Sequence, residues 1–109
     1  LKNFSLYRPS KDYQLAPAYD LLNTTIANPK DKEELAMTLS GRKSKLCLDD
    51  FLNTAKTIGL DKKIVLHLVK GFEKSLPKWK SLIESSFLDE DIKKEYNKLI
   101  ISRLHRLQR

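Results

Sequence analysis

An asparagine and an aspartate near the start of the chain have the residue types and spacing best suited to chemistry. Asn3 opens the stretch NFSLY, and Asp20 closes the stretch YQLAPAYD. An amide oxygen and a carboxylate are ligands that a hard cation such as Mg²⁺ prefers, and that ion is usually shared with the phosphates of a substrate. Spacing alone leaves two interpretations open. The pair binds a metal, or Asn3 is an ordinary turn residue and Asp20 caps a helical turn.

Two short strands are expected to bring this pair together. Residues 4–7 and 13–16 alternate apolar and polar side chains, and the RPSKD segment between them is rich in turn formers. A strand rises about 3.3 Å per residue out and back, so a hairpin returns the chain to its starting point. Pro17 ends the second strand because it lacks a backbone donor. The hairpin should therefore place residues 3 and 20 side by side.

Helical patterns dominate the chain from residue 49 onward. The expected helices cover residues 49–58, residues 61–76, a segment opened by Pro77 and a segment capped by Asp89. Residues 23–34 are expected to form a loop, and residues 35–48 alternate in a way typical of short strands around a turn at Gly41. The sequence predicts a mainly α fold, with about four helices and a small N-terminal β-hairpin, in a single domain over residues 1–109.

The composition of the chain indicates its cellular location and the kinds of partner it can bind. The 109 residues suffice for one domain, and their net charge is +7. No stretch approaches 18 apolar residues, so we expect no membrane partner. The lone Cys47 favours a reducing, cytoplasmic location. Basic residues near position 43 and in the last helix form either a solvated face or a docking surface for an acidic partner or a DNA-bound complex. The residues assigned to that surface are Arg42, Lys43, Lys45, Arg103 and Arg106.

The segment LKNFSLY…YQLAPAYDLLNTT resembles the HipA-like serine/threonine kinases. The C-terminal lobe of that family carries a D-x-H-x-K-N-F-S catalytic loop, then a short hairpin and an L-x-P-x-Y-D segment. The stretches ELAMTLSGRKSKL, DDFLNTAKTIGL and SRLHRL are similar to later parts of the same family. The resemblance implies the helical C-lobe of a protein-kinase-like fold. It also implies that the N-lobe and the catalytic base Asp lie upstream of Leu1, so no catalytic base is expected among these residues.

The resemblance implies roles for four residues. Asn3 and Asp20 match the magnesium ligands of the family, an arrangement that protein kinases share. Lys2 lies beside Asn3 and is expected near the phosphates, and Tyr19 is expected to line the nucleotide site. Mg²⁺ and ATP are thus the cofactors expected for the parent kinase. Residues 1–109 alone are expected to bind neither and to be inactive.

The same resemblance implies partners. Members of the family are toxins of toxin–antitoxin modules that phosphorylate a cytoplasmic protein, an aminoacyl-tRNA synthetase in the best-known case. They pair with a small helix-turn-helix antitoxin, so we expect a HipB-like antitoxin and indirect contact with DNA through it. One alternative is a non-catalytic helical interaction module that binds an antitoxin-like repressor or DNA. Another is a basic nucleic-acid-binding domain.

Overall fold

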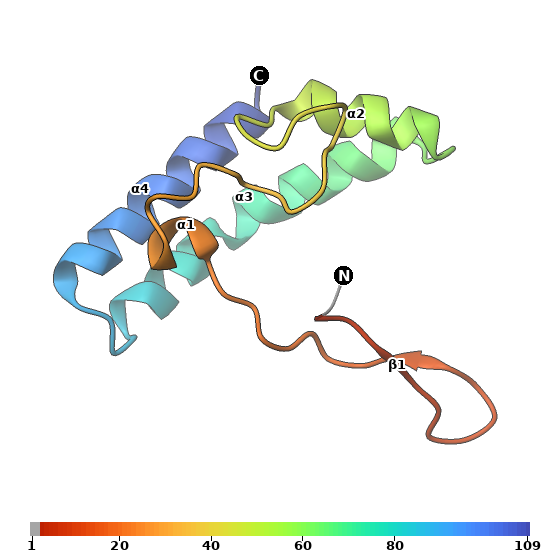
Figure 1. Cartoon of the computed structure of the whole chain (residues 1–109), viewed down its shortest axis with the longest axis horizontal. Helices are drawn as coiled ribbons and strands as arrows, with labels where there is room; N and C mark the ends of the chain where they lie inside the picture. The colour runs from red at the N-terminus through yellow and green to blue at the C-terminus, as the bar shows by residue number, and fades with distance from the viewer. Residues whose placement is uncertain (1–2) are drawn as a thin grey trace.

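The structure is a computed structural model that describes residues 3–109, in which a helical bundle carries a projecting hairpin (Figure 1). The strands are β1 (Leu6–Tyr7) and β2 (Gln14–Leu15), and the helices are α1 (Thr24–Ala27), α2 (Leu48–Thr57), α3 (Lys62–Glu84) and α4 (Glu90–Leu107). The predicted fold class, mainly helical with a small N-terminal hairpin, is confirmed.

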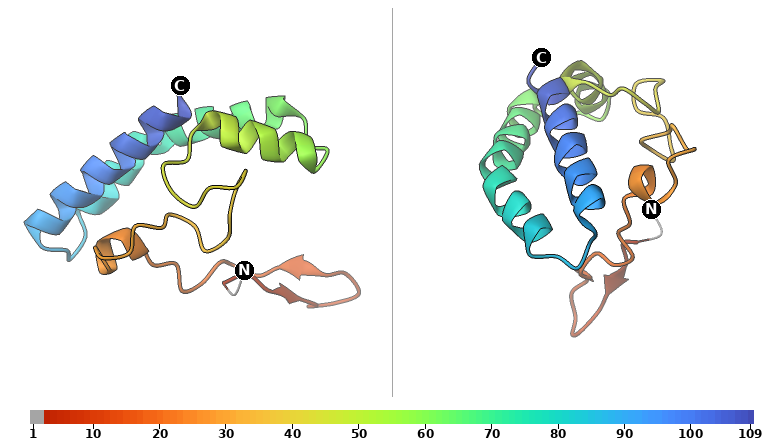
Figure 2. Two further views of the ribbon diagram at one scale, coloured as in Figure 1. Left: turned by 45° about the horizontal axis from the view of Figure 1, so that its top comes forward. Right: turned by 90° about the vertical axis from the view of Figure 1, so that its left-hand side faces the viewer.

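The core lies between the three longer helices. Helices α3 and α4 run side by side, and α2 packs on α3 near the C-terminal end of α4 (Figure 2). Val65 and Val69 lie one turn apart on α3 and are buried, as is Leu104 of α4. Burying each of these side chains stabilises the fold by about 2 kcal/mol. Further along α3, the rings of Phe72 and Trp79 meet with centroids 5.9 Å apart.

Local signals in the sequence set two of the helix boundaries. Asp61 Oδ1 accepts a hydrogen bond from the backbone N–H of Lys63 at 2.8 Å, which caps α3 as predicted. Gly59 follows α2 with φ of 72°, a left-handed conformation that glycine adopts without steric cost. Asp89 occupies the N-cap position of α4, but its side chain makes no capping hydrogen bond.

The start of α2 is fixed by a carboxylate that reaches back to the preceding turn. The backbone N–H of Cys47 donates to Asp50 Oδ2 at 3.0 Å. This hydrogen bond, aided by the Cys47 thiol and the charge of Arg42, holds the pKa of the Asp50 carboxyl below its ordinary value despite partial burial. Cys47 is therefore part of a helix cap, half-buried beside a carboxylate.

Pro77 does not begin a new helix, so this prediction was wrong. The segments expected on either side of it form the single helix α3, with Pro77 inside. A proline within a helix removes one backbone hydrogen bond and costs about 3 kcal/mol. Buried and half-buried side chains of α3 on both sides of Pro77, such as Val69 and Ile83, face the bundle. Their burial outweighs the local cost, because ending the helix would uncover one half of that face.

Two predictions between residues 23 and 48 were wrong in part, although residues 28–34 form a loop and the predicted turn at Gly41 is present. Residues 24–27 form the one-turn helix α1, in which Asn23 Oδ1 accepts from the backbone N–H of Ile26 at 3.3 Å. The predicted strands within 35–48 reduce to one isolated bridge between Leu39 and Arg42. The alternation reflects an irregular segment that lies on the bundle, with some of its apolar side chains turned inward.

An ion-pair cluster on α4 holds this irregular segment in place. Arg106 Nη2 donates to Glu34 Oε1 at 2.6 Å, and Arg103 Nε lies 3.9 Å from the same oxygen. The other oxygen of Glu34 accepts from the backbone N–H of Leu46 at 3.3 Å. Arg103 also donates to Thr25 Oγ1 at 2.8 Å, which ties α1 to α4. We call Glu34, Arg103 and Arg106 the α4 clamp.

The electrostatics of the clamp favour the ionised form of Glu34. Burial alone would raise the pKa of this carboxyl. The hydrogen bonds from Arg106 and Leu46, together with the charges of Arg106 and Arg103, outweigh that effect and hold the pKa below its ordinary value. The clamp therefore stabilises the fold only while Glu34 is ionised.

The hairpin reaches away from the bundle. The radius of gyration is 16.1 Å, against about 13 Å for a compact domain of this length. The cross-strand neighbours Leu6 and Leu15 remain 67% and 65% exposed. Among the described residues, no helix has both the length and the apolar character needed to cross a membrane.

The α4 clamp predicts a pH-dependent loss of stability in Glu34→Gln. The substitution keeps the side-chain shape but removes the charge that Arg106 and Arg103 face, so the free energy of unfolding should fall by about 2 kcal/mol at pH 7. The clamp contribution is complete above the unfolded-state pKa, near 4.5. It should disappear as pH falls through the lower folded-state pKa. Urea unfolding of both proteins between pH 7 and pH 3 measures the difference.

Glu33→Gln is the matched control, because Glu33 makes an exposed ion pair with Lys43 at 3.0 Å. Such a pair contributes less than about 1 kcal/mol. Equal losses in the two variants, or a Glu34→Gln effect that does not diminish at all between pH 5 and pH 3, would contradict the clamp.

Pro77→Ala should stabilise the protein by about 2 kcal/mol. The alanine N–H restores a hydrogen bond within α3, and the gain is reduced because the unfolded chain becomes less restricted. Thermal and urea unfolding measure the change, with Pro29→Ala in the irregular segment as the control. A lower stability for Pro77→Ala would show that packing around α3 requires the proline geometry.

Candidate functional site

Strand pairing brings the two ends of the hairpin together. Leu6 pairs with Leu15 and Tyr7 with Gln14 in antiparallel register. Beyond the strands, the backbone N–H of Ala16 donates to the Ser5 carbonyl at 2.8 Å. The N–H of Tyr19 donates to the Asn3 carbonyl at 3.3 Å. The two chain segments thus stay paired as far as residues 3 and 19.

Asn3 and Asp20 are in direct contact at the open end of the hairpin. Asn3 Nδ2 donates a hydrogen bond to the backbone carbonyl of Asp20 at 2.8 Å. Within residues 3–109, neither Asn3 Oδ1 nor the Asp20 carboxylate takes part in a hydrogen bond or ion pair. The contact therefore fixes the amide of Asn3 and leaves its oxygen and the carboxylate available to a ligand.

Asp20 has a backbone conformation that side chains rarely adopt. Its φ is 53°, in the left-handed region. This conformation costs an ordinary residue about 1 kcal/mol or more, although aspartate tolerates it better than most. Residues held in such conformations are concentrated at active sites and ligand clamps. The hydrogen bond from Asn3 to the Asp20 carbonyl helps to hold this conformation.

The pair has the chemistry of an incomplete cation site. Two oxygen donors of this kind suit Mg²⁺, which keeps several waters and takes further ligands from substrate phosphates. In the part of the chain that the structure describes, no group of three or more His, Cys, Asp or Glu side chains could hold a metal. The donor set therefore fits a cation shared with a phosphate ligand better than one enclosed by protein.

Tyr19 and Lys2 are the other two residues predicted for nucleotide binding. Tyr19 precedes Asp20 and is half exposed, and its backbone N–H pairs with Asn3. Lys2 lies outside the described residues.

The residues predicted to form a basic docking surface make ion pairs within the chain. Lys43 pairs with Glu33 at 3.0 Å, and Arg42 Nη1 lies 3.8 Å from Asp50 Oδ2. Arg103 and Arg106 belong to the α4 clamp. Among the described residues, Lys45 alone of these five makes no ion pair or side-chain hydrogen bond. The sequence did not single out Glu34, because its partners lie about 70 positions away and no local pattern marks it.

A hairpin with Asn3 and Asp20 at its open end, leading into a helical bundle, is the arrangement expected of the helical lobe of a protein-kinase-like fold. The family model of the HipA-like C-terminal domain matches residues 1–79. The chain therefore belongs to this family, whose members are serine/threonine kinases of toxin–antitoxin modules that pair with HipB-like antitoxins. The match includes the hairpin and ends within α3, so the similarity of SRLHRL to the family stays a prediction. No curated protein matches the chain.

The contact between Asn3 and Asp20 predicts local loosening in Asn3→Ala. Losing the side-chain hydrogen bond should cost the open end of the hairpin about 1 kcal/mol, and amide exchange of Tyr19 should become about fivefold faster. Hydrogen exchange followed by NMR measures this rate. Asn53→Ala on the exposed side of α2 is the control and should leave it unchanged. A Tyr19 rate unaffected by Asn3→Ala would show that backbone pairing alone closes the hairpin.

Proposed function

We propose that this chain is the C-terminal lobe of an ATP-dependent serine/threonine kinase, the toxin of a toxin–antitoxin module. Its part in the reaction is to hold the Mg²⁺ of Mg·ATP with Asn3 and Asp20. One observation carries this proposal. The hairpin brings the side chain of Asn3 against the backbone of Asp20 and leaves both the Asn3 amide oxygen and the Asp20 carboxylate without a partner among the described residues.

The proposed chemistry depends on positioning and charge. Phosphoryl transfer is accelerated chiefly by orienting the phosphate and stabilising its charge. When bound, Mg²⁺ supplies positive charge at the phosphate oxygens. Asp20 contributes the negative ligand, and Asn3 contributes a neutral one whose orientation is set by its 2.8 Å bond to the Asp20 carbonyl. Tyr19 lines the nucleotide site and Lys2 approaches the phosphates in this proposal.

The proposed partners follow from the family. A HipB-like antitoxin pairs with the parent kinase and brings it to DNA. The substrate is a cytoplasmic protein that is phosphorylated on Ser or Thr. An aminoacyl-tRNA synthetase is the first candidate substrate to test. The proposed location is the cytoplasm, where ATP and such substrates are found.

A helical interaction module without chemistry is the second candidate function. The observation that favours it is a hollow of about 290 Å³ between α2 and α3, lined by apolar side chains such as Phe51 and Phe72, with Leu39 and Leu107 also in its wall. Exposed apolar surface of this kind is common where a partner protein docks. An antitoxin-like repressor is the partner proposed for it.

The magnesium site predicts that Asp20→Asn weakens Mg·ATP binding by at least about tenfold. The substitution keeps the size of the side chain and a residue type that tolerates positive φ, but it removes the charge that faces the cation. Isothermal titration of the full-length protein with ATP, with and without Mg²⁺, measures the affinity. Nucleotide binding without the metal should change little.

Asp12→Asn is the matched control, because Asp12 is an exposed aspartate of the same hairpin. Unchanged Mg·ATP affinity in Asp20→Asn would contradict the proposed site. If the unsubstituted protein binds no Mg·ATP but still binds its antitoxin, the interaction module becomes the better account.

A further inference from the structure

A row of lysines follows the outer face of α3. Lys63, Lys70, Lys74 and Lys78 lie 7, 4 and 4 positions apart and are all exposed. At 3.6 residues per turn these positions share an arc of about 80°. The face of α3 that contains Val65 and Val69 lies opposite. We call these four side chains the lysine row.

The lysine row is straight and long. With a rise of 1.5 Å per residue, Lys63 and Lys78 are about 22 Å apart along the helix axis, and the last three members follow one another about every 6 Å. His67 and Ser81 occupy the other positions on this face and are also exposed. The row is therefore a polar, cationic strip without an aromatic or aliphatic member.

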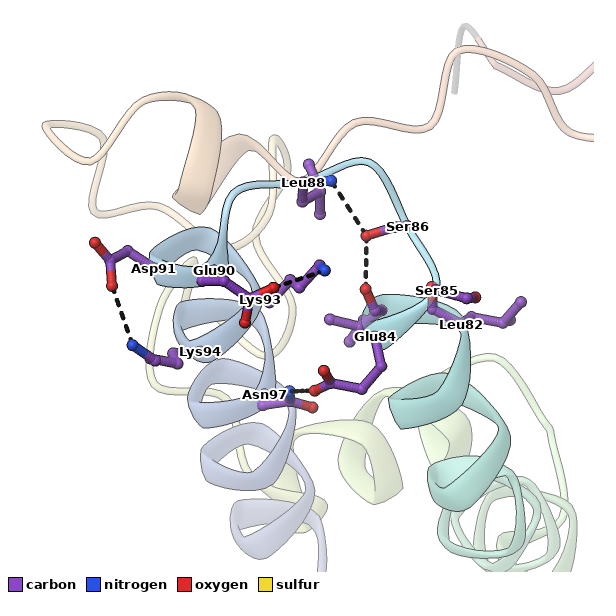
Figure 3. A network of polar contacts seen from close by, with 11 residues as sticks. Leu82, Glu84, Ser85, Ser86, Leu88, Glu90, Asp91, Lys93, Lys94 and Asn97 are labelled. Atoms are coloured by element: carbon purple, nitrogen blue, oxygen red, sulfur yellow. Dashed lines mark hydrogen bonds and ion pairs between the residues drawn. The ribbon is translucent and has the colours of Figure 1, made fainter.

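Within residues 3–109, no member of the lysine row makes an ion pair or a side-chain hydrogen bond. Two acidic residues, Glu73 and Glu84, also lie on α3, but both are held by amides of the chain's C-terminal part. Gln108 Nε2 donates to Glu73 Oε1 at 3.1 Å. Asn97 Nδ2 donates to Glu84 Oε1 at 3.3 Å (Figure 3). The acids are thus drawn toward α4, and the row keeps its full positive charge.

We propose that the lysine row is a contact surface for the phosphate backbone of double-stranded DNA. A duplex presents phosphates at regular intervals along each of its strands, and ammonium groups that replace its counterions gain affinity without reading sequence. Protein interfaces, in contrast, are depleted in lysine and are anchored by aromatic or apolar side chains, which the row lacks. Single-stranded nucleic acid is held by aromatic stacking, for which the row offers no ring.

This surface goes beyond the proposed kinase function and uses none of its residues. It also differs from the basic surface predicted from sequence, where four of the five cations are paired with carboxylates of the chain. A cation already paired within the protein gains less from a phosphate, because the existing contact must be broken. No member of the lysine row has such a contact to lose within residues 3–109.

The experiment compares two triple variants of the full-length protein, bound to its antitoxin where it has one. The first, Lys70→Gln/Lys74→Gln/Lys78→Gln, shortens the row. The second, Lys11→Gln/Lys30→Gln/Lys98→Gln, removes the same charge from positions outside α3 that are exposed and, among the described residues, unpaired. Fluorescence anisotropy with a labelled duplex, at salt concentrations from 50 to 200 mM, gives the slope of log K against log salt. Circular dichroism verifies that both variants are folded.

The row variant should reduce the magnitude of the salt slope by about 3, or about 1 per lysine, and weaken duplexes of unrelated sequence alike. The control variant should change the slope by less than about 1. Equal effects in the two variants would show that net charge alone is responsible and would overturn the proposal. It would also be overturned if the unsubstituted protein bound RNA duplex or phosphatidylserine vesicles in preference to DNA, with the same dependence on the row.

Discussion

The hydrogen-bonded ion pair between Arg106 and Glu34 is the interaction on which the arrangement of this chain depends. Between Ala27 and Leu48 the chain has no helix and no strand, and its backbone hydrogen bonds, such as those from the N–H groups of Glu34 and Leu35 to the Lys43 carbonyl, do not tie it to α3 or α4. Glu34 joins that stretch to α4 through Arg106, and it also receives the N–H of Leu46 just before α2 begins. One carboxylate therefore connects the last helix with the entry to the first long one. Arg103, through Thr25, extends the same anchoring to α1.

Features governed by near neighbours were predictable from the sequence. Asp61 and Gly59 mark helix boundaries because caps act within one turn, and the hairpin followed from alternation on either side of a turn. The contact between Asn3 and Asp20 was predictable for the same reason, since it needs only that the chain folds back on itself. The left-handed backbone at Asp20 was not, because residue type permits this conformation without requiring it.

The wrong predictions arose where distant packing overrides local preference. Pro77 is favoured at the start of a helix, yet apolar residues on both sides of it belong to one continuous buried face of α3. A count of charged residues fails to predict the basic surface for the same reason. The last helix is rich in cations by count, but two of its arginines are turned inward by Glu34. Among the described residues, the lysines of α3 stay unpaired because the acids of that helix bond to amides of another part of the chain.

The hairpin also affects the solubility of these residues. A ribbon of two strands has two outer edges, each with backbone donors and acceptors that no neighbouring strand occupies. Here those edges flank the exposed pair Leu6 and Leu15 on an arm that extends from the bundle. Such an edge is a template for another strand. In a concentrated solution of these residues alone, self-association should therefore begin at the arm, through pairing of ribbons from different molecules.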